Sequence, residues 1–164
     1  MQLHHYEDFE TCAAKWVRTI RETEHPDVLV GLFHAGPEGN RLDNVVENAS
    51  ADVAQKVPGF DVVFMGHDHA RHCRKIVNVA GDSVLIVDPA NRAGFVSDVT
   101  IRVSKKDGKV LRKSVEGTLT NVRDYPADEA FVRKFQPQYQ STIDFVSRKI
   151  GRINQTISTK HSYF

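Results

Sequence analysis

Two histidines separated by a single residue directly follow an apolar run, and together these residues could bind a metal ion. The apolar run covers 60–65, and the tetrapeptide 66–69 that ends it reads Gly-His-Asp-His. Neutral imidazole is the commonest metal ligand in proteins near neutral pH, because its free pKa is about 6.5. An earlier apolar run, 27–33, also ends in a histidine. The candidate metal ligands are therefore His34, His67 and His69.

The segments that carry these histidines predict a strand–helix–strand unit. Runs 27–33 and 60–65 are apolar apart from Asp27 and Asp61, as expected for strands buried on both faces of a parallel sheet, and 44–56 has helical spacing with Asp43 as its cap. The two strands of such a unit are usually neighbours, about 4.8 Å apart, and end at the same edge of the sheet. Ligands bind at the carboxyl ends of the strands in these sheets. We therefore expect the three imidazoles to converge there.

The second half of the sequence predicts an antiparallel sheet and then a helix. Short apolar runs cover 75–79, 83–87, 95–103 and 110–120. The last two are joined by a hairpin turn at 105–109, and we expect the whole antiparallel sheet to pack on the first half. A helix capped by Asp128 follows, and Pro137 is expected to kink it or divide it in two. Residues 152–159 have the pattern of a further strand.

Composition excludes several classes of function. The chain has 164 residues, 22 basic and 21 acidic side chains and a net charge of +1, which fits one domain or part of one. This balance gives no electrostatic reason to expect duplex nucleic acid or an anionic membrane as a partner. No run of about 18 apolar residues exists that could span a bilayer. Two cysteines are too few for a disulfide framework.

Other side chains have alternative roles that the sequence leaves open. Asp68 could orient a neighbouring histidine or face water, and Cys73 could add a sulfur ligand or be a plain buried thiol. We assign Trp16 to the core face of a helix over 8–23, and we expect His72 to be exposed. The candidates for supporting the ligands or contacting a substrate phosphate are Asp68, Asn91 and Arg92.

Three stretches resemble motifs of the calcineurin-like metallophosphoesterases. They are DVLVGLFHAG at 27–36, PGFDVVFMGHDH at 58–69 and VDPANRAG at 87–94. The closest subgroup is the 5′-nucleotidase / 2′,3′-cyclic-nucleotide 2′-phosphodiesterase family. The helix after Asp128 resembles the linker helix that precedes the C-terminal substrate domain of that subgroup. The resemblance covers nearly the whole chain.

The resemblance implies an α/β (α+β) fold, a partial four-layer αββα sandwich with a C-terminal linker helix. Residues 1–122 would be the C-terminal part of the catalytic domain, 123–150 the linker helix region and 151–164 the start of a truncated nucleotidase domain. The Asp-x-His, Gly-Asp-x-x-Asp and Asn-His motifs of the family are absent from this sequence. We therefore expect a piece that needs an N-terminal half and a C-terminal domain to complete it.

The resemblance also implies a hydrolase with two divalent metal ions, which could be zinc, manganese, iron, magnesium or calcium. His34 and His67 would ligate one ion and His69 the other. The reaction would be hydrolysis of phosphate esters of nucleotides by a metal-activated hydroxide, of the 5′-nucleotidase or cyclic-phosphodiesterase type. Three neutral histidines cannot balance the charge of two dications, so we expect the isolated piece to be inactive.

Two other functions fit the residues. The three histidines and a water could form a self-contained zinc site, which would show as one tightly held ion. Alternatively the chain is a non-enzymatic interaction domain whose histidines are incidental, in which case replacing them would not change metal uptake. Localisation is left unassigned: family members are usually periplasmic or extracellular, and residues 1–7 have no apolar core of the kind found in signal peptides.

Overall fold

The computed structural model describes residues 7–39, 41–42 and 45–154 of the chain. The chain divides into two units, one that ends at Tyr125 and one that begins at Pro126. The first unit contains the histidine motifs.

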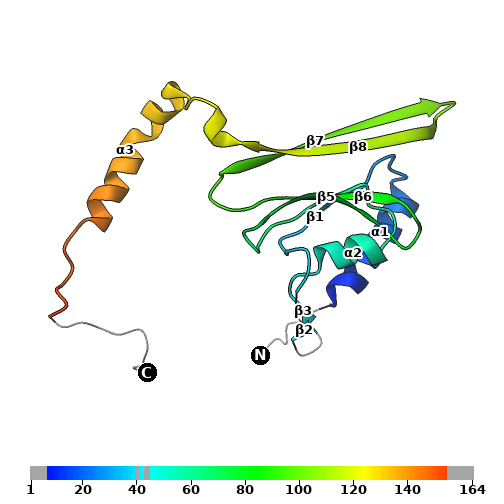
Figure 1. The fold of residues 1–164 in the computed structure, drawn as a ribbon, viewed down its shortest axis with the longest axis horizontal. Coiled ribbons are helices and arrows are strands. Elements are labelled where there is room, and N and C mark those ends of the chain that lie inside the picture. The colour runs from blue at the N-terminus through cyan, green and yellow to red at the C-terminus, as the bar shows by residue number, and fades with distance from the viewer. Residues whose placement is uncertain (1–6, 40, 43–44, 155–164) are drawn as a thin grey trace. The chain divides into compact units, whose positions relative to one another are not determined.

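A four-stranded sheet with strand order β1-β4-β6-β5 is the centre of the first unit (Figure 1). Its strands are β1 (Val30–Leu32), β4 (Val62–Phe64), β5 (Arg71–Val77) and β6 (Ser83–Pro89). Strand β4 is parallel to both β1 and β6, and β5 is antiparallel to β6. The prediction that the two strands preceding the histidine motifs are parallel neighbours is therefore confirmed.

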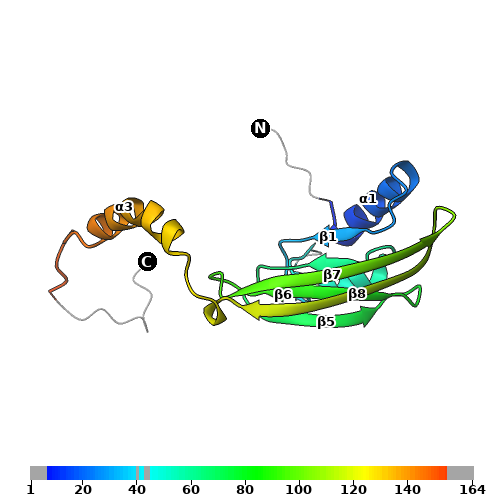
Figure 2. The ribbon, with the colours of Figure 1, turned by 90° about the horizontal axis from the view of Figure 1, so that it is seen from above.

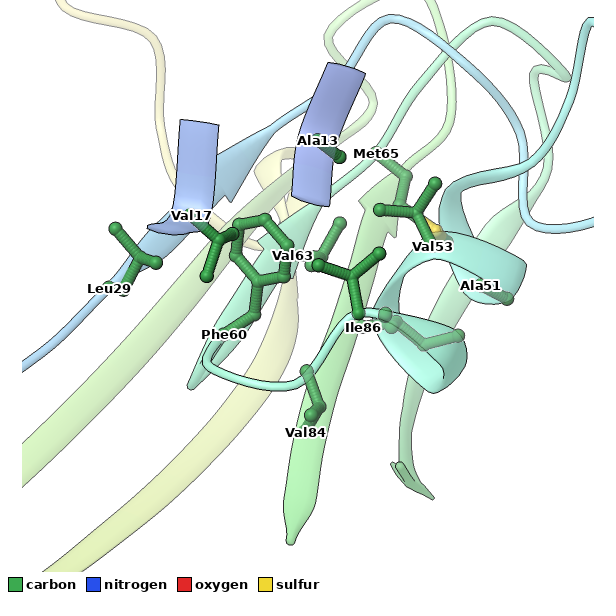
Figure 3. Close-up of a cluster of buried hydrophobic side chains, with 12 residues drawn as sticks. Ala13, Val17, Leu29, Ala51, Val53, Phe60, Val63, Met65, Val84 and Ile86 are labelled. Carbon is green, nitrogen blue, oxygen red and sulfur yellow. The ribbon is translucent and has the colours of Figure 1, made fainter. Parts of the chain in front are cut away.

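Two helices, α1 (Phe9–Thr23) and α2 (Ser50–Lys56), cover one face of this sheet. Asp8 caps α1 through a hydrogen bond from the Thr11 N–H. Figure 3 shows the core between the helices and the strands. Its buried side chains include Ala13, Val17, Val53, Val63, Met65, Val84 and Ile86.

A long hairpin covers the other face of the sheet (Figure 2). It consists of β7 (Phe95–Lys106) and β8 (Lys109–Asn121), joined at Asp107 and Gly108, which both have positive φ. That conformation matches the right-handed strand twist of a two-residue hairpin turn. The second core lies under the hairpin, where the buried residues are Val62, Leu85, Val87 and Val115. Helices, sheet and hairpin form three layers, and the predicted mixed α/β class is confirmed, whereas the resemblance implied part of a four-layer αββα sandwich.

The remaining elements are short or lie outside the first unit. Strands β2 (Arg41–Leu42) and β3 (Val45–Val46) pair with each other, and η1 (Val122–Asp124) is a single 3₁₀ turn. Helix α3 (Glu129–Val146) lies in the second unit and is capped by Asp128, as predicted. It runs through Pro137 as one helix, so the proline does not divide it in two. None of the described helices is long and apolar enough to cross a membrane.

Part of the predicted helix over 44–56 is wrong. Helix α2 begins only at Ser50, and the residues Val45–Val46 form strand β3. The reason is tertiary, because the N–H groups of Ser50 and Ala51 donate to the carbonyl oxygens of Gly36 and Pro37 at 3.0 and 2.9 Å. These carbonyls fix the first turn of α2 in place of a side-chain cap. The predicted cap Asp43 lies outside the described residues.

Strand β1 is not buried on both faces, contrary to the prediction. It lies at the edge of the sheet, where Val30 is 45% exposed and Leu32 84% exposed. Trp16, assigned to the core, is 57% exposed for a related reason, since α1 lies beside this edge. An apolar run indicates that a strand favours burial. It does not specify which segment covers the strand.

The predicted antiparallel second half is also partly wrong. Strand β6 lies between β4 and β5, so 71–89 completes the first sheet and only the β7–β8 hairpin forms a separate layer. Within 151–154 the structure has no strand, and the rest of the predicted strand over 152–159 lies outside the described residues.

Candidate metal site

The imidazoles of His34 and His67 face each other at the carboxyl ends of β1 and β4. The pairing of these strands continues past β1, because the Phe33 N–H donates to the Phe64 carbonyl at 2.9 Å. His34 Nε2 and His67 Nδ1 are 3.4 Å apart, and the ring centroids are 5.2 Å apart at 73°. This is the side-by-side emergence that the crossover predicted for these two residues.

The separation of the two ring nitrogens fits one metal ion. Metal–nitrogen bonds of about 2.0–2.1 Å that meet at a tetrahedral angle hold their nitrogens roughly 3.3 Å apart. Two unprotonated imidazole nitrogens that face each other repel, so either a proton or a cation between them stabilises the arrangement. The His34–His67 pair can therefore supply two ligands to one ion.

Glu47 supports this pair from the other side of the His67 ring. Its Oε1 lies 3.0 Å from His67 Nε2, and the carboxylate side chain is 68% exposed. A carboxylate at Nε2 favours the tautomer that carries its proton on Nε2. The Nδ1 atom facing His34 is then free to bind a metal, and the carboxylate increases its basicity.

The loop that carries His34 is tied to α2 and to the second histidine loop. The Gly36 N–H donates to Asn48 Oδ1 at 2.6 Å, and the Ser50 hydroxyl donates to the Ala35 carbonyl at 2.7 Å. The Gly66 N–H, in the second loop, also approaches the Ala35 carbonyl at 3.4 Å. These bonds satisfy loop backbone groups that would otherwise be buried without partners.

The structure does not bring a third ligand to the histidine pair within the residues it describes. No group of three histidine, cysteine, aspartate or glutamate side chains there is placed to hold one ion. The self-contained three-histidine zinc site is therefore not formed by the described residues. His69 is exposed, follows His67 by two residues and has a φ of 59°. Its role as a ligand of a second ion stays a prediction.

Asp68, between the two histidines, is partly buried and is paired with β5. Its Oδ1 accepts from the Ala70 N–H at 2.9 Å, and its Oδ2 lies 3.0 Å from His72 Nε2. His72 is thus partly buried and paired rather than exposed, which corrects the prediction. Burial raises the pKa of Asp68, but the hydrogen bonds from Ala70 and His72 outweigh it, and the pKa is lowered overall.

Asp88, at the end of β6, is fully buried beside Asp68. Its Oδ1 accepts from the Ala90 N–H at 2.8 Å. Burial raises the pKa of Asp88, and the charge of Asp68 raises it further. The pKa values of the two neighbouring carboxyl groups are therefore shifted in opposite directions, lowered for Asp68 and raised for Asp88.

Asn91, Arg92 and Cys73 are the remaining candidates from the sequence, and none of them contacts the histidine pair by any contact observed among the described residues. Asn91 and Arg92 are exposed in the loop after β6, where Arg92 has a φ of 60°. Cys73 is an exposed free thiol on β5 and belongs to no metal-binding group among the described residues.

Sequence reasoning missed two residues, Glu47 and Asp88. Asp88 directly follows the apolar run 83–87, so the strand-end rule that selected the histidines would also have selected it. Glu47 lay within the segment predicted as helix, which concealed that the chain there approaches His67. A correct boundary for α2 would have left Glu47 in a loop beside the sheet edge.

Comparison with known proteins identifies the fold of the chain. No family model matches the chain. The trifunctional nucleotide phosphoesterase protein YfkN of Bacillus subtilis (strain 168) is 25% identical over 151 residues, which cover 84% of this chain and 10% of that protein. The crystal structure of the calcineurin-like phosphoesterase YfkN from Bacillus subtilis matches with a TM-score of 0.69 at 22% identity, over 88% of this chain and 46% of that one. The chain has the fold of a calcineurin-like phosphoesterase. The sequence resemblance to metallophosphoesterases of the 5′-nucleotidase type is thereby confirmed.

Two further solved structures share this phosphoesterase fold. They are a 5′-nucleotidase precursor from Thermus thermophilus, at 18% identity, and the NAD nucleotidase NadN of Haemophilus influenzae, at 15%. Each has a TM-score of 0.62 and covers 88% of this chain. The chain spans only 29% and 36% of these two proteins, less than half of the YfkN structure and a tenth of the curated YfkN protein.

Proposed function

We propose that this chain forms part of a dinuclear-metal phosphoesterase that hydrolyses phosphate esters of nucleotides. The observation that carries the proposal is the His34–His67 pair, whose nitrogens are 3.4 Å apart at the strand ends. The relatives that share the fold are named as nucleotide phosphoesterases or nucleotidases, which supports a nucleotide as the substrate.

The residues of this chain would hold one ion and orient its ligands. His34 Nε2 and His67 Nδ1 would ligate that ion, Glu47 would keep the proton of His67 on Nε2, and His69 is the proposed ligand of the second ion. A bound divalent ion supplies Lewis acidity toward phosphoryl oxygens and lowers the pKa of water. Asn91 and Arg92, in the neighbouring β6 loop, are the proposed contacts of the substrate.

The site needs further ligands, and the sheet has an open edge where they could enter. Two dications close together require anionic ligands, which neutral histidines do not provide. Beside β1 the structure has an apolar cleft of about 270 Å³ lined by Trp16, Leu32 and Phe33. We propose that polypeptide from outside this chain pairs with β1, covers this cleft and brings the missing carboxylates.

Metal content of purified variants tests the proposal. We expect Zn²⁺ or Mn²⁺ to bind weakly to the wild-type chain, and the affinity to be lost in His34→Ala and His67→Ala. His25→Asn is the matched control, since His25 also has a positive φ but does not belong to the site. Equal metal uptake by all four proteins would contradict the site.

Hydrolysis of a 5′-nucleotide and of a 2′,3′-cyclic nucleotide tests the dinuclear requirement. We expect negligible metal-dependent turnover by the isolated chain, because the anionic ligands are supplied from outside it. Turnover should appear when a longer polypeptide that supplies carboxylates at the β1 edge is present, and should be lost there in His67→Ala. Robust turnover by the isolated chain would show that its own residues complete the site.

A further inference from the structure

We propose that Asp88 is a positioning residue for the loop that carries His67 and His69, which it holds through a hydrogen bond to Asp68. The proposal rests on the proposed function in so far as these histidines bind metal. Asp88 itself touches neither histidine by any contact that we observe among the described residues, so it would act through Asp68.

The strand register places Asp88 where it can hold this loop. Asp88 of β6 pairs directly with His72 of β5, and His72 Nε2 is 3.0 Å from Asp68 Oδ2. Asp88, His72 and Asp68 thus come together from two strands and the histidine loop. The Asp88 side chain is fully buried, whereas those of Asp68 and His72 are 22% and 24% exposed.

The buried carboxyl group of Asp88 has one oxygen that no nitrogen or hydroxyl donor reaches. Oδ1 accepts from Ala90, but Oδ2 has no such partner among the described residues. A buried oxygen without a partner is costly. A proton on Asp88 removes this cost, because the neutral acid can donate a hydrogen bond to the ionised Asp68.

The loop needs such an anchor because its backbone is strained on both sides of Asp68. His67 has a φ of 82° and His69 a φ of 59°, values that residues with a side chain adopt rarely. Strained conformations of this kind persist when the surrounding structure holds them. The bonds of Asp68 to Ala70 and His72, together with the proposed bond to Asp88, would fix the residue between the two histidines and so the directions in which both imidazoles leave the backbone.

The test compares Asp88→Asn with Asp88→Ala in the full chain. The amide of asparagine can still accept from Ala90 and donate to Asp68, whereas alanine can do neither. We expect Asp88→Asn to keep the Zn²⁺ affinity of the wild type and Asp88→Ala to weaken it about 10-fold or more. Isothermal titration with Zn²⁺ measures the affinity, and the ¹H–¹⁵N resonances of 66–70 in the metal-free chain report the loop directly.

Asn78→Ala is the matched control for a general loss of stability. Asn78 is also a buried polar residue, and its Oδ1 accepts from the N–H groups of Ala80 and Asp82 at the other end of β5 and β6. We expect this variant to lower the melting temperature without changing Zn²⁺ affinity or the resonances of 66–70. Asp68→Ala removes the other partner of the proposed hydrogen bond at a less buried position. It should reproduce the effects of Asp88→Ala on Zn²⁺ affinity and on the resonances of 66–70, and it can be measured even if Asp88→Ala folds poorly.

Two outcomes would overturn the proposal. One is that Asp88→Asn disturbs the loop resonances as much as Asp88→Ala. The other is that Asp68→Ala or a folded Asp88→Ala leaves them unchanged. Failure of the proposed function is recognised separately, because His67→Ala would then bind Zn²⁺ as well as the wild type while the loop resonances still respond to Asp88.

Discussion

At the scale of single residues, the arrangement of the His67 ring is decided by its two partners. Its Nδ1 faces His34 Nε2 and its Nε2 faces the carboxylate of Glu47, so each ring nitrogen has a separate task. A carboxylate on the far nitrogen makes the near nitrogen a better electron donor. We therefore expect Glu47 to influence metal affinity through the His67 ring.

Replacing Glu47 by glutamine should weaken Zn²⁺ binding by about 10-fold, because the amide can accept the Nε2 proton but carries no charge. Thermal stability should hardly change, since the Glu47 side chain is 68% exposed. Titration calorimetry and thermal denaturation measure the two effects. Glu38→Gln removes the same charge from an exposed pair with Arg74 and serves as the control. An equal loss of Zn²⁺ affinity in both variants would mean that the change in net charge, and not the contact of Glu47 with His67, causes the effect.

At the scale of elements, the candidate site depends on how closely two loops approach. The loop after β1 and the loop after β4 meet at Gly36, where an added Cβ would lie 2.9 Å from Asp68 Cβ and 2.9 Å from Asn48 Oδ1. Real Cβ atoms essentially never come so close to other atoms. Glycine at this position is therefore what allows the His34 loop to pack against the loop of His67.

Gly36→Ala should destabilise the fold and separate the two imidazoles. Overpacking of this kind costs about 1–3 kcal/mol, and we expect Zn²⁺ affinity to fall as well because the loops must move apart. Chemical denaturation and Zn²⁺ titration measure these effects. Gly94→Ala is the control, since its Cβ would lie a comfortable 3.9 Å from the Asn91 carbonyl oxygen. A Gly36→Ala variant as stable as Gly94→Ala would contradict the close approach.

At the scale of the whole molecule, the sheet of the first unit is covered on both faces at its centre but is exposed at its β1 edge. Helices and hairpin cover the centre of the sheet, but at β1 the apolar side chains of Val30 and Leu32 stay exposed. An edge strand with exposed apolar side chains is a site for strand addition or association. This edge adjoins His34, so a segment that covered it would lie beside the candidate metal site.

Leu32→Lys should reduce self-association of the isolated chain, because a lysine on an edge strand opposes pairing with a second chain. Folding should be unaffected, since Leu32 is 84% exposed. Sedimentation velocity over a range of concentrations measures the association. Leu111→Lys alters an exposed leucine of the hairpin (66%) and should leave association unchanged. If both substitutions act alike, the β1 edge has no special role.

Much of the candidate site was predictable from the sequence because the signals were local. A continuous apolar run that ends in a histidine indicates both the strand and the position of the imidazole at its end. A crossover between two such strands makes them parallel neighbours. These two facts placed His34 beside His67 without any coordinates.

The exposure of β1, the insertion of β6 between β4 and β5, and the start of α2 at Ser50 were not predictable in this way. Each depends on which segment of the chain covers or caps another, and hydrophobic periodicity contains no information on that choice. The same is true of Glu47 and Asp88, whose roles come from neighbours distant in the sequence.

By itself, the sequence determined the two strands with their terminal histidines, the β7–β8 turn and the resemblance to metallophosphoesterases, since these depend on residue types at short range. The fold was needed to show that the two imidazoles approach to 3.4 Å, with Glu47 at Nε2 of His67 and Asp88 next to Asp68. The physical reason is that hydrogen bonds and burial are properties of residues brought together by the fold.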